Sequence, residues 1–249
     1  MCQFGTNGII SNPNAPRPTQ AASGFACYGA LALAQIDSTC GSLRERNQRY
    51  YNIGKPTGAV PGIAVPLACH HVIGWDVIWG FWNALIASGD FKKARAYLAI
   101  CGVAQTETAK LEKQVKSNSF QAGPNWDAKL CWNPINLVRG PEDRSDDPNG
   151  LPTPREKIDF KLAPSDVYGG RVAKLVETGN AMCDYMDAPR NTAKAEKAIQ
   201  YLRTIRAEPI MEWDESLWVV DKTRPGYSST AAPGGGFLVV RPTWKIVNS

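Results

Sequence analysis

Histidine is almost missing from this chain: the 249 residues include two, His70 and His71, and they are adjacent. Histidine is the side chain whose ordinary pKa allows proton transfer near neutral pH, so imidazole chemistry here must use this pair. The sequence also contains no G-x-G-x-x-G, P-loop or H-E-x-x-H pattern, which leaves nucleotide-cofactor and zincin classes without support. Its seven cysteines include no C-x-x-C pair, so we expect mostly reduced, buried thiols rather than a zinc knuckle.

Long apolar runs are missing as well. None approaches the roughly 20 residues that span a bilayer, and the N-terminus has no charged region followed by a hydrophobic one. We therefore expect no membrane insertion and no cleaved signal, with synthesis in the cytoplasm. A hydrophobic content of 43% can fill a core. The 28 Lys and Arg residues exceed the 23 Asp and Glu residues by five, which permits a polyanionic partner without requiring one.

Periodicity and turn residues predict an α+β fold that is mainly helical, compact, and organised in three parts. These are an N-terminal arm and helices over residues 1–60, a core over 61–150, and a C-terminal part over 151–249. We expect the C-terminal part to hold a helical hairpin and a strand pair. The expected helices cover 24–35, 76–87, 91–101, 106–115, 172–186 and 192–206, and the expected terminal strands are 217–220 and 237–240.

The histidine pair lies between two different kinds of segment. Residues 62–69 are apolar and include Pro66, which predicts a short or edge strand. After the pair, apolar residues recur every three or four positions from Asp76, a good N-cap, to Ala87, which predicts a helix. We therefore expect both imidazoles where an extended segment gives way to a helix. The aromatic residues of that helix are most simply core residues.

Two other segments carry polar groups of interest. A short apolar element over 135–138 enters a loop rich in carboxylates, amides and prolines over 139–150, a composition that suits a hard metal ion or a phosphate. An exposed acidic turn would have the same composition. Residues 42–51 combine three arginines with two tyrosines, which could contact phosphates and stack on a base. A solvated helix face explains this segment equally well.

Taken together, His70-His71, the aromatic helix behind them, residues 132–138 and residues 144–148 resemble the HNH, or His-Me finger, nuclease superfamily. The likeness is to its endonuclease VII-like, double-histidine members among bacterial polymorphic toxins. It implies a small ββα-metal core of two strands and a helix, which holds one divalent cation against the scissile phosphate. The span between His71 and Asn136 is longer than in compact members and must hold a helical insertion.

The resemblance also implies residue roles. His71 would be the general base, and Asn136 would fix the loop of the site. His70 would bind the metal ion together with Asp146 or Asp147, because the chain has no third histidine. A mixed nitrogen and oxygen site suits Mg, Mn, Ni or Zn.

The expected activity is metal-dependent endonuclease hydrolysis of phosphodiester bonds in DNA or RNA, by an antibacterial toxin. The resemblance implies an immunity protein, a secretion-system carrier and delivery into the cytoplasm of a target cell. We expect substrate contacts from four arginines: Arg46, Arg49, Arg139 and Arg144.

Two other classes of function remain open. Cys27 opens a predicted helix, where its thiol pKa would fall, and His70 or His71 could act as its base. This order of residues resembles papain-like peptidoglycan amidases, which are cysteine hydrolases. Alternatively, the chain is a non-enzymatic binding or structural protein whose two histidines are hydrogen-bonded core residues.

Overall fold

The computed structural model describes residues 4–10, 50–51, 63–64, 67–124, 126–131, 133–141, 144–162, 168, 170–189, 191–205, 211, 217–221, 223, 227–231, 237–239 and 243–246. Over these residues the chain is α+β and mainly helical, as the sequence predicted. In this part of the chain, no helix is both long and apolar enough to cross a membrane.

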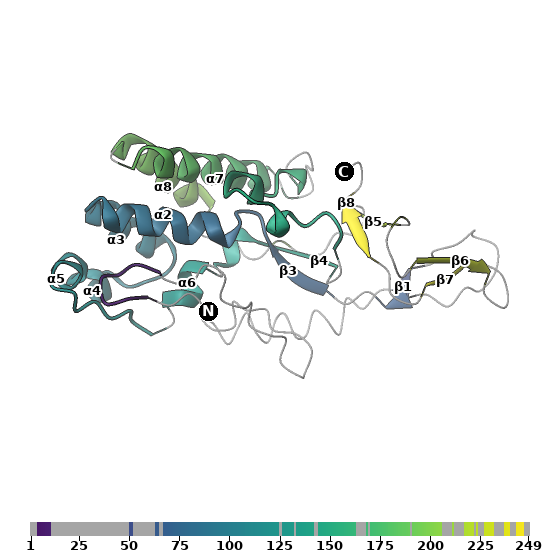
Figure 1. Cartoon of the computed structure of the whole chain (residues 1–249), viewed down its shortest axis with the longest axis horizontal. Helices are drawn as coiled ribbons and strands as arrows, with labels where there is room; N and C mark the ends of the chain where they lie inside the picture. The colour runs from purple at the N-terminus through teal and green to yellow at the C-terminus, as the bar shows by residue number, and fades with distance from the viewer. Residues whose placement is uncertain are drawn as a thin grey trace.

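Helix α2 (Trp75–Ala87) occupies the centre of the helical part. It packs against α3 (Phe91–Ile100) and against α7 (Arg171–Asp187), which forms an antiparallel hairpin with α8 (Thr192–Ile205). Figure 1 shows the hairpin lying along one side of α2 and α3. The predicted helical hairpin is therefore confirmed.

Shorter helices cover the other side of α2 and α3 (Figure 1). They are α4 (Gln105–Thr108), α5 (Leu111–Lys116) and α6 (Trp126–Cys131). The sequence predicted one helix over 106–115, but the chain forms α4 and α5 separately. Residues 4–10 pack here too, where the Trp82 indole N–H donates to the Gly8 carbonyl over 2.8 Å.

The core is a single apolar cluster that joins the helices to the strands. Phe81 of α2 is fully buried and makes edge-to-face contacts with Tyr97 of α3 and Tyr185 of α7, at centroid distances of 5.4 and 5.5 Å. Such aromatic pairs add stability beyond the area that they bury. The aromatic residues of α2 thus connect three helices, which fixes the helix that follows the histidine pair.

The start of α2 differs from the prediction by two residues. Gly74 is the N-cap, and its N–H donates to the Lys157 carbonyl over 3.0 Å. Asp76 lies within the first turn, where it accepts the Trp79 indole N–H over 3.1 Å and forms an ion pair with Lys157. A carboxylate in the first turn is favoured by the helix dipole, so Asp76 stabilises the same helix end from a different position.

The strands form antiparallel pairs. Strand β3 (Leu67–His71) pairs with β4 (Leu137–Pro141), next to the N-terminal end of α2 (Figure 1). Strand β1 (Tyr50–Tyr51) pairs with β2 (Ile63–Ala64).

The C-terminal strands do not pair as predicted. Strand β5 (Trp218–Val220) pairs with β8 (Trp244–Ile246), and β6 (Tyr227–Ala231) pairs with β7 (Phe237–Val239). The prediction had paired the segments that contain β5 and β7. Several short apolar segments near the C-terminus can each act as a partner, and only the packing of β5 and β8 against the segment 144–146 selects among them.

Candidate active site

The histidine pair ends strand β3, as predicted. His70 is opposite Val138 of β4, and His71 is opposite Leu137. Neighbouring residues of a strand point to opposite faces, so the two imidazoles lie on different faces of this ladder. Helix α2 begins four positions after His71. The pair is thus held by a strand pair on one side and by a buried helix on the other.

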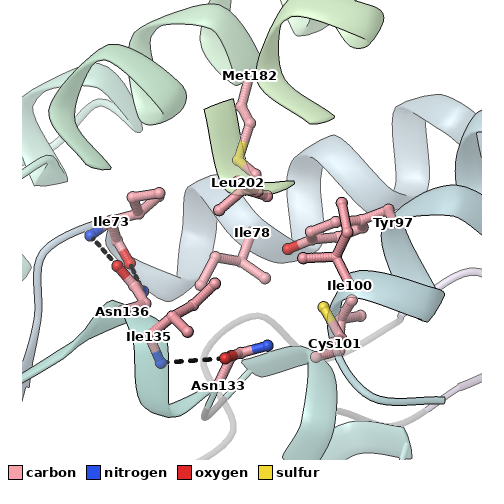
Figure 2. Close-up of a pocket in the computed structure, with 11 residues that line it drawn as sticks. Ile73, Ile78, Tyr97, Ile100, Cys101, Asn133, Ile135, Asn136, Met182 and Leu202 are labelled. Carbon is pink, nitrogen blue, oxygen red and sulfur yellow. Dashed lines mark hydrogen bonds between the residues drawn. The ribbon is translucent and has the colours of Figure 1, made fainter. Parts of the chain in front are cut away.

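Asn136 closes the loop that follows His71. Its side-chain oxygen accepts the Ile73 N–H over 2.7 Å, and its side-chain nitrogen donates to the Ile73 carbonyl over 2.8 Å. Figure 2 shows both hydrogen bonds. The Asn136 carbonyl also accepts the Val72 N–H over 3.0 Å. Because the Asn136 side chain is 3% exposed, these bonds are shielded from water and hold residues 72–73 in one conformation.

The His70 ring is fixed by neighbours on three elements. Its Nε2 lies 2.8 Å from the Pro141 carbonyl oxygen, at the end of β4. Its Nδ1 lies 3.7 Å from Oδ2 of Asp147. The Trp218 ring of β5 packs beside it, with centroids 5.9 Å apart.

These contacts determine the tautomer of neutral His70. A carbonyl oxygen can only accept a hydrogen bond, so Nε2 carries the proton that it donates to Pro141. Nδ1 then has a free lone pair, and this lone pair faces the carboxylate of Asp147. Two acceptors face each other in this arrangement, which suits a cation held between them.

The His70 and Asp147 pair fits a divalent cation. Nitrogen and oxygen ligands lie about 2.0–2.2 Å from a zinc ion, so two ligands of one ion can be separated by the observed 3.7 Å. Metal-binding histidines usually donate their other N–H to a carbonyl or carboxylate, as His70 does to Pro141. Over the described residues, no cluster of three or more His, Cys, Asp or Glu side chains is suitable for a metal ion. The two ligands would thus leave most of the coordination shell to water and substrate.

The residues of the candidate site are mostly buried, but their solvent exposure differs. His70 is 7% exposed and His71 is 9% exposed, whereas the Asp147 side chain is 20% exposed. Solvent and substrate would therefore approach this site from the side of Asp147.

Asp146, the other predicted ligand, points toward Arg144 rather than His70. Its Oδ1 accepts from Arg144 Nε over 2.6 Å, and its Oδ2 accepts the Ile246 N–H over 3.1 Å. Burial tends to raise the pKa of Asp146, but the hydrogen bond and charge of Arg144 outweigh it and lower that pKa. Of the two adjacent aspartates, the structure brings Asp147 to His70.

Two arginines predicted to contact substrate face the interior. Arg139 of β4 is 2% exposed. The Arg144 side chain is 1% exposed, and its guanidinium binds Asp146 and Asp159. Neither position supports a contact with a substrate phosphate. The other two, Arg46 and Arg49, lie outside the described residues, as does Cys27 of the cysteine hydrolase alternative.

Two of the described thiols, Cys101 and Cys183, are free. Burial raises the pKa of Cys101 to about 12, although side-chain hydrogen bonds from Asn133 and Tyr97 oppose this. Burial likewise raises the pKa of Cys183 to about 11. Neither thiol is suited to act as a nucleophile near neutral pH.

Two hollows lie near these elements. A cavity of about 20 Å³ is lined by Ile73 and Asn136 together with side chains of α2, α3, α7 and α8 (Figure 2). Its size suits one water molecule rather than a substrate. A surface groove of about 440 Å³ lies between α3, α4 and α8, with Arg95 and Arg203 in its lining. The lining of this groove includes none of the predicted site residues.

Gly140 allows His70 and Trp218 to pack against the same strand. A Cβ atom at this position would lie 2.5 Å from the Trp218 ring and 3.0 Å from Cδ2 of His70. We expect Gly140→Ala to destabilise the fold by about 1–3 kcal/mol, the usual cost of overpacking. Gly150→Ala is the matched control, because a Cβ atom there meets nothing within 4 Å. Urea unfolding of both variants measures the difference, and equal stabilities would contradict the packing described here.

Sequence reasoning missed three contributors to this site. They are the Pro141 carbonyl, the Trp218 ring and the buried Asp159 carboxylate, which interacts electrostatically with His70. Pro141 is the last residue of β4 and Asp159 lies in a short irregular segment, and no sequence pattern marks either position. Trp218 looked like any apolar strand residue. Comparison of the chain with models of protein families, with curated proteins and with solved structures found no match.

Proposed function

We propose that the protein is a metal-dependent nuclease that hydrolyses phosphodiester bonds in DNA or RNA, with a ββα-metal core of the His-Me finger type. The observation that carries this proposal is the Asn136 side chain, which binds both polar groups of the Ile73 backbone. This bond pair joins the start of β4 to the loop directly after His70 and His71. A double histidine on one strand with an asparagine holding the following loop is the pattern that the resemblance predicts.

In this proposal the two histidines have different tasks. His71 takes a proton from the attacking water, for which a neutral imidazole near pH 7 is suited. His70 and Asp147 are the residues that would hold the cation. The ion, when bound, would neutralise charge on the phosphate and on the departing oxygen. The chain contributes alignment: the Asn136 bonds hold the loop after His71, and the Pro141 carbonyl sets the ring of His70.

The biological setting is a further part of the proposal and depends on the resemblance alone. It comprises a toxin, a carrier that delivers it into a target cell, and an immunity protein that protects the producing cell. Co-expression of this protein with each gene that flanks its own gene would identify an immunity protein, because one of those genes should relieve toxicity.

A plasmid-nicking assay tests the proposed activity. Purified protein should convert supercoiled plasmid to open circles with added Mg²⁺, Mn²⁺, Ni²⁺ or Zn²⁺, and EDTA should stop the reaction. A structured RNA in a parallel reaction shows which nucleic acid is preferred. Hydrolysis that continues in EDTA, or absence of cleavage with every metal and both substrates, would contradict the proposal. Hydrolysis of peptidoglycan that resists EDTA and is lost in Cys27→Ser would favour the cysteine hydrolase instead.

A further inference from the structure

Arg144 lies at the centre of a buried ion-pair network beside the candidate site. Its Nε donates to Asp146 over 2.6 Å and its Nη1 donates to Asp159 over 2.5 Å. The guanidinium carbon also lies 5.0 Å from the centre of the Trp218 ring. Burial alone would lower the pKa of Arg144, but the two carboxylates raise it. Arg144 therefore stays charged and keeps both aspartates in place.

Each partner of Arg144 is connected to a residue of the candidate site, by sequence, by a hydrogen bond or by packing. Asp146 precedes Asp147, the residue that faces His70. The Asp159 N–H donates to the Val72 carbonyl over 2.7 Å, directly after His71. Trp218 packs on the ring of His70 as well as on Arg144. Of the three partners of one guanidinium, Asp159 thus bonds the residue that follows β3, Asp146 precedes the carboxylate that faces His70, and Trp218 packs on the His70 ring.

The same segment is bound to the C-terminal strands. The Ser145 N–H donates to the Trp244 carbonyl over 2.8 Å, and the Ser145 hydroxyl donates to Asp221 over 2.7 Å. The Ile246 N–H donates to Asp146. Asp221, Trp244 and Ile246, at or next to β5 and β8, thus help to set the position of a segment more than 70 residues earlier in the chain.

We propose that Arg144 is a positioning residue: with the β5 and β8 pair, it holds Asp147 and the His70 ring in the geometry that binds the metal ion. The inference rests on the proposed function for the ion, but the orientation of His70 can be measured without one. Arginine suits this role because its planar fork donates to two carboxylates at once, whereas lysine carries a compact charge without that geometry.

The test uses the full chain without a histidine tag, so that the protein contains only two imidazoles. Nitrogen-15 NMR of labelled histidine gives the tautomer of each ring, and a His71→Gln sample assigns the two sets of signals. Addition of Mn²⁺ then measures metal affinity at His70 from line broadening. Three variants are compared with the original chain: Arg144→Lys, the milder Ser145→Ala, and Arg155→Lys as control. Arg155 also binds two aspartates, Asp184 and Asp187, but on an exposed surface.

We expect His70 to be in the Nε2–H tautomer in the original chain and in Arg155→Lys. In Arg144→Lys the nitrogen-15 signals of His70 should move to the positions of a ring that exchanges between its two tautomers. Mn²⁺ affinity should fall about 10- to 100-fold, as for other groups that orient metal ligands. Ser145→Ala should change both in the same direction by a smaller factor. If Arg144→Lys does not fold, the Ser145→Ala variant still tests whether this network positions His70.

Two other outcomes would contradict either the role of Arg144 or the proposed function. If the variants melt at lower temperature but keep the His70 tautomer and the Mn²⁺ affinity, Arg144 stabilises the fold only, and the inference is wrong. If the original chain neither binds Mn²⁺ near His70 nor cleaves nucleic acid, the proposed function fails. The tautomer comparison still decides whether Arg144 positions His70 in that case.

Discussion

Replacing His71 by alanine should lower the rate of phosphodiester hydrolysis by about 10²- to 10⁴-fold, the usual contribution of a positioned general base. Metal affinity should change little, because His71 lies on the opposite face of β3 from the pair formed by His70 and Asp147. The plasmid-nicking rate and a calorimetric metal titration of the same sample measure the two effects.

His70→Ala is the matched comparison, since it removes the neighbouring imidazole from the same strand. It should weaken metal binding, and excess metal should recover part of the rate. Equal loss of metal affinity in both variants would contradict the division of tasks between the two histidines. Full activity in either variant would contradict the proposed active site.

Asn136→Ala should destabilise the protein and remove nuclease activity together. The substitution leaves the Ile73 N–H and carbonyl buried without their present partners, and each such group costs about 1–3 kcal/mol. The loop after His71 loses the bonds that hold it, so His71 loses its alignment even in molecules that remain folded. Thermal melting and the nicking rate, measured well below the melting temperature, separate the two effects.

Asn133→Ala is the control for this experiment. Asn133 lies three positions earlier. Its side-chain oxygen accepts from Ile135 within its own turn, over 3.1 Å, and its side chain also bonds the Cys101 thiol rather than the loop after His71. Loss of such a cap costs about 1 kcal/mol, and the nicking rate should stay close to that of the original chain. If Asn136→Ala cleaves as fast as Asn133→Ala below the melting temperature, Asn136 has no part in aligning the site.

The sequence by itself determined the longer helices α2, α3, α7 and α8 and the place of the histidine pair. The repeat of apolar residues from Val77 to Ile86 specifies one buried face, and this face predicted α2 to within two residues at its start and to the same residue at its end. The hairpin of α7 and α8 followed from the same signal. A helix is stabilised by bonds and contacts within a few residues, so its signal is present in a short stretch of sequence.

The tertiary structure decided which residues that are distant in the sequence contact each other. Asp146 and Asp147 are neighbours with the same side chain. The bond from Ile246 and the ion pairs with Arg144 and Lys161 direct Asp146 away from His70. Arg144 itself looked like a phosphate contact, because a sequence shows a charge but not whether a buried carboxylate will meet it. The pairing of β5 with β8 has the same cause: strand partners are chosen by packing across the whole fold, and no local pattern encodes that choice.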